Sequence, residues 1–190
     1  MKLKVCLALA VSAILCASIV AGEKLKSGPE VGAGIAAFNV VKCSGAPNDN
    51  VSVGDELCYR CKYGQNAQVM VFARKSSKAV AALAQGLDSA IEKADGKNLK
   101  AFVNLLGEDR DELESAAKEL GEGSKLASVP VVVPVEFENG PADYGISPEA
   151  EVTVVIAKKG KVAATHALAA GELNEESAQA ILSDVQKVIE

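Results

Sequence analysis

Cysteine is the residue type in this chain best placed to carry chemistry. Cys58 and Cys61 form a Cys-x-x-Cys pair, and Cys43 precedes them. Two thiols at this spacing can close a small disulfide ring or supply two ligands to a metal ion. Arg60 and Lys62 place positive charge beside the pair. Because such charge favours the thiolate, we expect both residues to lower the pKa of the thiols.

The cysteines allow three interpretations that the sequence alone leaves open. In the first, Cys58 and Cys61 are a redox-active dithiol. In the second, Cys43 bridges to one of them as a structural disulfide, closing a loop of roughly 14 to 17 residues and adding about 3 kcal/mol of stability. In the third, the three cysteines and His166 bind Cu(I) or Zn(II) through a Cys₃His set. The metal site is only an alternative: our prediction from the sequence includes no metal ligand and no cofactor.

The first 22 residues have the order of a secretory signal peptide. Two lysines in Met1–Lys4 precede an uncharged stretch, Val5–Val20, and the small residues Ala21 and Gly22 follow as a cleavage site. The apolar stretch is about 16 residues long, whereas a membrane span needs roughly 20. We therefore expect a periplasmic or secreted protein with no membrane association after cleavage. An uncleaved anchor helix, or a lipoprotein modified at Cys16, is the alternative.

The composition describes an ordinary globular chain of one domain. It has 190 residues, of which 49% are hydrophobic and 24% charged, with a net charge of −5. An acidic balance argues against nucleic acid as a partner. The absence of Trp and an aromatic content of 4% argue against a stacking surface for bases. The sequence does not predict an oligomeric state.

The mature chain divides into a flexible leader over residues 23–34 and one domain over residues 35–190. Hydrophobic periodicity within the domain predicts strands alternating with amphipathic helices, then a hairpin and a last helix. The expected strands are Ala36–Lys42, Gln68–Ala73, Leu99–Leu106, Val129–Phe137, Glu151–Ala157 and Lys161–Leu168. The expected helices are Lys78–Ala94, capped by Ser76 or Ser77, Asp109–Leu120, ended by Gly121–Lys125, and Glu175–Ile189, capped by Asn174.

This order of elements resembles the thioredoxin-like superfamily. A βαβαβ start, a C-terminal β-hairpin and a final helix imply an α/β fold with a central mixed sheet. The stretch Tyr144-Gly145-Ile146, followed by Val152–Val162, is similar to the last third of thioredoxins and peroxiredoxins. Cys58–Gly64, followed by VMVFAR, is similar to a group of exported bacterial thioredoxin-like proteins. The resemblance spans roughly residues 30 to 190 of the chain.

The reactive-site signature of the superfamily is displaced. Its reactive cysteine follows the first central strand, at the start of the next helix, where the helix dipole favours a thiolate. Here Arg74-Lys75-Ser76-Ser77 occupies that place, and the proline that faces the site in the family is absent before Val152. The Cys-x-x-Cys instead precedes the central strand.

The resemblance implies thiol–disulfide redox chemistry in the cell envelope, with a protein dithiol or disulfide as partner. It implies that Cys58 attacks and Cys61 resolves, with Cys43 as an alternative resolving partner. The activity would be that of a thiol–disulfide oxidoreductase lacking the usual active-site cysteine position. The rival hypothesis is a non-catalytic scaffold or interaction module that keeps its cysteines as a structural disulfide, and thiolate metal binding is a second alternative.

Overall fold

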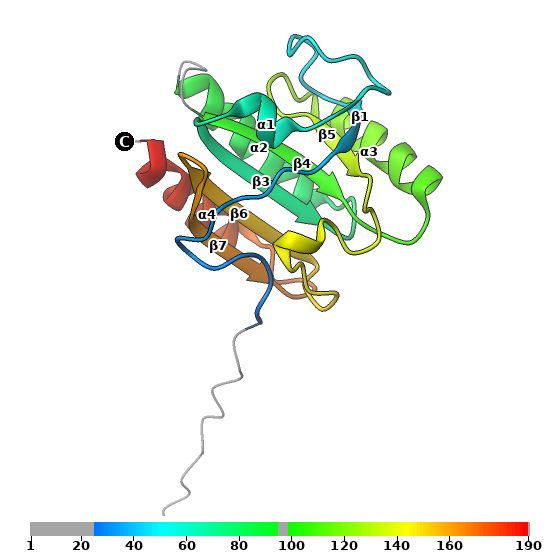
Figure 1. Ribbon diagram of the computed structural model, residues 1–190. Helices are drawn as coiled ribbons and strands as arrows, with labels where there is room; N and C mark the ends of the chain where they lie inside the picture. Colours follow the sequence, from blue (N-terminus) through cyan, green and yellow to red (C-terminus); the bar gives the residue numbers. More distant parts are fainter. Residues whose placement is uncertain (1–24, 95–98, 190) are drawn as a thin grey trace, which may run out of the picture.

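A computed structural model describes residues 25–94 and 99–189, which form one seven-stranded mixed sheet (Figure 1). The expected signal peptide lies outside these residues. The strand order is β2-β1-β5-β4-β3-β6-β7. The three central strands run parallel, while β1, β6 and β7 are antiparallel to their neighbours. The strands are β1 (Val40–Ser44), β2 (Glu56–Leu57), β3 (Ala67–Ala73), β4 (Leu99–Leu105), β5 (Val131–Pro134), β6 (Val152–Lys158) and β7 (Lys161–Leu168).

Helices cover the sheet unequally on its two faces (Figure 1). Helices α2 (Lys78–Lys93), α3 (Arg110–Ser124) and α4 (Glu175–Ile189) pack on one face, over a core rich in Val, Leu, Ile and Ala. The short helices α1 (Tyr59–Tyr63) and η1 (Ala142–Tyr144) lie on the other, over a core that holds the aromatic side chains. The second face is thus covered by short helices and irregular chain.

Strand β3 shows how the sequence builds both cores at once. All of its residues are buried, as expected for a central strand whose two faces are both covered. Val69 and Val71 belong to the aliphatic core, whereas Met70 and Phe72 belong to the aromatic core on the opposite face. This alternation is the period of two that a pleated strand imposes.

Most predicted elements are confirmed within a residue or two of their limits. Ser77 caps α2 by accepting a hydrogen bond from the Val80 amide, and Asn174 accepts one from the Ser177 amide at the start of α4. The β6–β7 hairpin turns at Lys159 and Gly160, both with positive φ, as the sequence indicates.

Several limits differ from the predictions. The first strand begins at Val40 rather than Ala36, and α3 continues past Gly121 to Ser124. Strand β5 is shorter than expected because Pro130 precedes it and Pro134 ends it, and it lies between β1 and β4. Helix α1 and strand β2 were not predicted.

Residues 25–34, expected to belong to a flexible leader, lie against β6 and β7 instead. Ser27 is buried and its hydroxyl lies 2.6 Å from that of Thr153. The backbone amide of Gly32 donates to the Val162 carbonyl, and that of Ile35 donates to the Gly160 carbonyl. These contacts make the segment part of the domain. No helix in the described part of the chain is long and apolar enough to cross a membrane.

Candidate functional site

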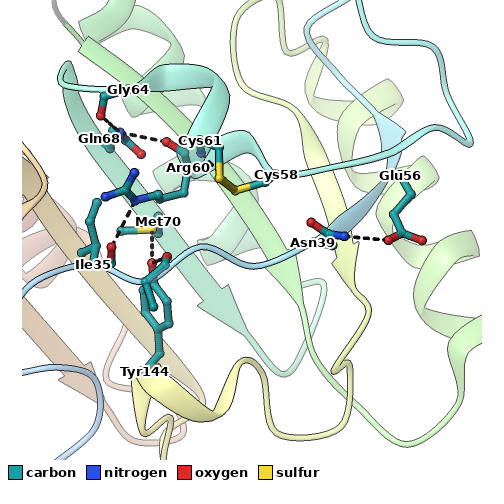
Figure 2. Close-up of a disulfide and its surroundings, with 11 residues drawn as sticks. Ile35, Asn39, Glu56, Cys58, Arg60, Cys61, Gly64, Gln68, Met70 and Tyr144 are labelled. Atoms are coloured by element: carbon teal, nitrogen blue, oxygen red, sulfur yellow. Dashed lines mark hydrogen bonds between the residues drawn. A yellow bond between two sulfur atoms is a disulfide. The ribbon is translucent and has the colours of Figure 1, made fainter.

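Cys58 and Cys61 form a disulfide at the start of α1 (Figure 2). Their Cα atoms are 5.2 Å apart. Cys58 is the N-cap residue of the helix, and its Sγ accepts a hydrogen bond from the Cys61 amide at 3.1 Å. Gly64, with a φ of 60°, ends the helix after five residues. Cys58 is half-buried and Cys61 is exposed, so the S–S bond lies at the protein surface.

Two tyrosines hold α1 on the sheet. Tyr59 and Tyr63 are buried, and both rings pack against Phe102 of β4 at centroid distances of 5.7 and 6.1 Å. Gln68, fully buried in β3, donates its side-chain amide to the carbonyls of Arg60 and Gly64. The helix thus presents apolar rings to the sheet and its cysteines to solvent.

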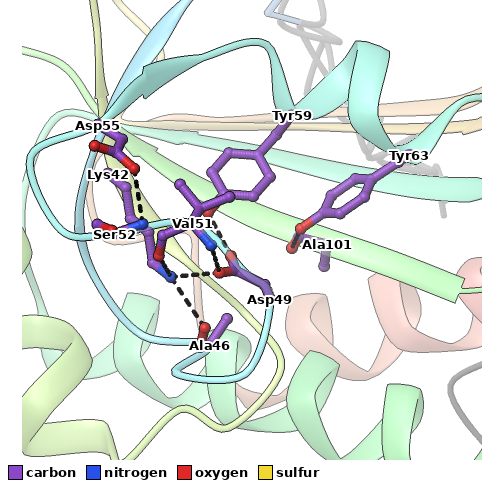
Figure 3. Close-up of polar contacts among 9 residues, drawn as sticks. All are labelled: Lys42, Ala46, Asp49, Val51, Ser52, Asp55, Tyr59, Tyr63 and Ala101. Atoms are coloured by element: carbon purple, nitrogen blue, oxygen red, sulfur yellow. Dashed lines mark hydrogen bonds and ion pairs between the residues drawn. The ribbon is translucent and has the colours of Figure 1, made fainter.

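A polar network, largely shielded from solvent, holds the hydroxyl of Tyr59 in place (Figure 3). The Tyr59 hydroxyl donates to Asp49 Oδ2, and Lys42 Nζ donates to Asp49 Oδ1 at 2.7 Å. Lys42 is only 2% exposed, and its ammonium also donates to the carbonyls of Ala46 and Val51. Burial, reinforced by the bond to Asp49, holds the pKa of Tyr59 well above its ordinary value. The residue that follows Cys58 is therefore tied to the loop over residues 45–55.

The two basic residues beside the cysteines take different positions. Arg60 extends away from the S–S bond and donates its Nε to the Ile35 carbonyl at 3.1 Å (Figure 2). Lys62 is exposed on α1. Their expected effect on the pKa of the thiols concerns the reduced pair, and it stays a prediction.

Cys43 is not part of the disulfide, which corrects the expectation that it bridges to Cys58 or Cys61. It is a free, buried thiol on β1. Its side chain packs in the aliphatic core with Ala117 and Leu120 of α3, whereas Tyr59 of α1 packs in the aromatic core on the other face. The sheet therefore lies between Cys43 and the disulfide.

The place that carries the reactive cysteine in the superfamily is taken up by structural contacts here. Arg74 follows β3 and donates to the carbonyls of Glu138 and Ser147. Lys75 pairs with Glu151 at 3.2 Å, and Ser77 caps α2. None of the described peptide bonds is cis. The described cysteines thus lie elsewhere, with Cys58 and Cys61 at α1 and Cys43 on β1.

The metal interpretation finds no support in the described residues. His166 lies on β7, where its Nε2 is 3.0 Å from Asp184 Oδ2 of α4. Its partner Asp184 belongs to α4, across the sheet from α1, and four strands separate β7 from Cys43 on β1. His166 therefore does not join the cysteines. No group of three or more potential ligands comes together in residues 25–94 and 99–189.

A groove of about 360 Å³ opens beside the disulfide, which sequence reasoning did not predict. It is lined by Ala37, Phe38, Asn39, Glu56, Cys58, Cys61, Val135, Glu136 and Pro141. Its walls come from the segment before β1, from β2 and from the loop after β5. Both cysteines of the disulfide are part of its lining.

Together, the mixed sheet and the element order define a thioredoxin-like fold, as the resemblance predicted. No protein-family model matches the chain, and no curated protein matches it in sequence. Many solved structures match in fold. The three described below share only 10 to 12% sequence identity with this chain, so they show the fold alone. A protein from Chlorobium tepidum described as the thiol:disulfide interchange protein DsbE aligns with a TM-score of 0.62 and 10% identity, covering 85% of this chain and 99% of that one.

Two further structures show the breadth of this similarity. A protein from Bacteroides thetaiotaomicron described as a protein disulfide isomerase has a TM-score of 0.59 and 12% identity, covering 87% of this chain and 94% of that one. A yeast mitochondrial 1-Cys peroxiredoxin has a TM-score of 0.56 and 10% identity, covering 83% and 75%. The fold is thus shared by proteins with different thiol reactions.

Proposed function

We propose that this protein exchanges thiols and disulfides through the Cys58–Cys61 pair. The observation that carries the proposal is the position of the disulfide: it caps a surface helix at the edge of a groove, and Cys58 Sγ accepts the Cys61 amide. A hydrogen bond from an amide stabilises a thiolate, which is the reactive form of cysteine. The similar folds described as interchange protein and disulfide isomerase support the same chemistry.

A purely structural role explains this disulfide less well. It joins residues three apart in sequence, so the chain-entropy model gives it about 2 kcal/mol, against about 3 kcal/mol for a bridge from Cys43. Tyr59, Tyr63 and Gln68 already hold α1 to the sheet without the S–S bond. A short helix anchored in this way can keep its place when the two thiols are reduced.

The exchange that we propose has two steps. In the reduced protein, the Cys58 thiolate attacks one sulfur of a partner disulfide, whose S–S bond breaks and releases one partner thiolate. Cys61 then attacks Cys58 Sγ, which restores the Cys58–Cys61 bond and releases the second partner thiolate. Two electrons pass from the protein to the partner. The reverse sequence oxidises a partner dithiol.

The place of this reaction is proposed from the sequence. Residues 1–22 have the order of an export signal. An exported protein would meet its partners in the cell envelope or outside the cell, where disulfides persist. A protein dithiol or disulfide is the partner that this chemistry requires.

The proposal is tested by measuring the reduction potential of the pair. Thiols are trapped across a glutathione series and a dithiothreitol series, and Cys43, Cys58 and Cys61 are mapped by mass spectrometry. We expect the Cys58–Cys61 pair to titrate at roughly −270 to −120 mV, the range of exchange enzymes. A potential below about −300 mV would mark a structural bridge and refute the proposal.

A matched pair of variants separates chemistry from folding. Cys58→Ser should abolish exchange with a protein disulfide, and because serine is a good N-cap residue, α1 should remain formed. Cys43→Ala should keep the exchange activity, since the sheet separates this thiol from the groove. Exchange that persists in a folded Cys58→Ser protein would contradict the roles assigned here.

A further inference from the structure

The groove beside the disulfide has carboxylates at its rim and no basic side chain in its lining. Glu56 and Glu136 are exposed and lie among the groove residues with Cys58 and Cys61. The remaining lining is apolar or neutral. A partner that brings its own sulfur to Cys58 therefore meets a lining whose charged side chains are both negative.

Each carboxylate is held in place by the protein itself. Asn39 Nδ2 donates to Glu56 Oε1 at 2.8 Å, and the Ala142 amide at the start of η1 donates to Glu136 Oε2 at 3.0 Å. These bonds orient the carboxylates without neutralising them. Among the described residues, no ion pair involves Glu56 or Glu136.

One cation lies close to the lining: the Arg110 guanidinium donates to the carbonyls of Pro134 and Val135, and it pairs with Glu114 at 3.3 Å. The Arg60 guanidinium is turned toward the Ile35 carbonyl (Figure 2). Arg60, Lys62 and Arg110 are all absent from the groove lining. The whole chain has a net charge of −5, which acts in the same direction as the rim. Complementary charge speeds encounter and selects among partners more than it adds affinity.

The groove also continues along the chain away from the disulfide. Val135, Glu136 and Pro141 line both this groove and a second hollow of about 520 Å³, whose lining extends to Ile146. The second hollow includes a further carboxylate, Glu138, and apolar side chains such as Phe137. Val135 is 44% exposed, so it adds accessible apolar surface to both hollows. The lining offers apolar side chains and carboxylates, which suit an extended peptide with apolar and basic side chains.

We propose that this groove, defined by Ala37–Asn39, Glu56, Val135, Glu136 and Pro141, selects partner segments whose cysteine is flanked by lysine or arginine. The inference rests on the proposed exchange function and names the substrate class for the same site. The partner cysteine lies over Cys58, and its basic neighbours face Glu56 and Glu136. The reaction is the exchange already described, with the partner disulfide as the electron acceptor.

The test compares three synthetic peptides that differ only in charge. Each is a capped hexapeptide with one cysteine flanked by Lys, Gln or Glu, oxidised to its symmetrical disulfide. The reduced protein is mixed with each peptide disulfide, and the second-order rate constant of the exchange is measured. It is divided by the rate constant for reduction of the same peptide disulfide by dithiothreitol, which removes the intrinsic reactivity of the peptide. We expect the normalised Lys peptide to react faster than the Glu peptide by roughly two- to fivefold for each carboxylate. The preference should collapse at about 1 M salt, where screening is strong.

Variants assign the preference to the groove. Glu56→Gln and Glu136→Gln should each lower the Lys-to-Glu ratio, and the double variant should bring it close to one. Glu119→Gln is the matched control, because Glu119 is exposed on α3, across the sheet from α1. If Glu119→Gln lowers the Lys-to-Glu ratio as much as Glu136→Gln does, the preference comes from the net charge of the protein and not from the groove. That result would overturn the inference.

The remaining outcomes distinguish the two proposals. Equal normalised rates for all three peptides would overturn the charge selectivity and leave the exchange function standing. Failure to react with any of the peptides, by a reduced protein with both thiols free, would overturn the exchange function and the selectivity with it.

Discussion

The chemistry of each cysteine depends on its immediate surroundings. Cys58 and Cys61 sit at the surface, whereas Cys43 is 6% exposed. Burial, together with the nearby carboxylate of Glu114, raises the pKa of Cys43 to about 11. A thiol that stays protonated is a poor nucleophile, so Cys43 is chemically quiet while the protein is folded.

This shift predicts a loss of stability at high pH. The ordinary thiol pKa is 9.0, so between pH 9 and about 11 the unfolded chain has lost the Cys43 proton that the folded protein keeps. Because the unfolded state then binds fewer protons, the free energy of unfolding falls as pH rises through this interval, by about 1 kcal/mol at pH 10.

Urea unfolding of the oxidised protein measures this effect, with Cys43→Ala as the reference. Both proteins are unfolded at about pH 8 and at about pH 10, so that the contributions of the groups they share cancel in the comparison. The wild type should lose about 1 kcal/mol more than the variant. Equal losses would mean that the Cys43 proton is not linked to folding.

At the scale of elements, α3 shows why a helix can continue through glycine residues that are expected to end it. Gly121 and Gly123 suggested an end after Leu120, but the helix runs to Ser124. Gly121 faces Ser44, the last residue of β1, and the following Gly45 so closely that a Cβ there would overlap the Ser44 side chain. This glycine lets the helix approach β1, and tertiary packing offsets its poor helix propensity.

The two glycines should therefore respond oppositely to alanine. Gly121→Ala forces overpacking against Ser44 and should lower the free energy of unfolding by about 2 kcal/mol. Gly123 has open space around it, so Gly123→Ala should raise stability by about 0.5 to 1 kcal/mol through helix propensity alone. Denaturant unfolding at neutral pH compares both with the wild type. A stabilising Gly121→Ala would contradict the packing account.

Element prediction from the sequence succeeded where the apolar pattern is long. Helices α2 and α4 and strand β7 have the predicted limits within one residue, because each repeats its period over several turns or pleats. Helix α1 was missed because five residues hold too little periodicity. Its signals were present, however: Cys58 stands where a cap accepts an amide, and Gly64 stands where the helix ends.

At the scale of the whole molecule, cysteine pairing depends on the sheet. The sequence identified three candidate cysteines but could not choose among their pairings, since a pairing depends on which face each side chain takes. In β1 the pairing register shifts between Lys42 and Ser44, so simple alternation does not fix the face of Cys43. Only the folded sheet places Cys43 with α3, opposite the disulfide on α1.

The separation of Cys43 from Cys58 by the sheet predicts how Cys58 reacts when Cys61 is replaced. In a Cys61→Ser variant, oxidised glutathione should form a mixed disulfide on Cys58 and leave Cys43 as a free thiol, because the sheet blocks a Cys43–Cys58 bond in the native fold. Peptide mapping after alkylation at low pH reads out both sites. The same oxidation in concentrated urea is the control, because the unfolded chain can bring the two cysteines together. A Cys43–Cys58 disulfide formed without urea would show that the native fold opens far enough for the two sulfur atoms to meet. In that case Cys43 would return as a resolving thiol.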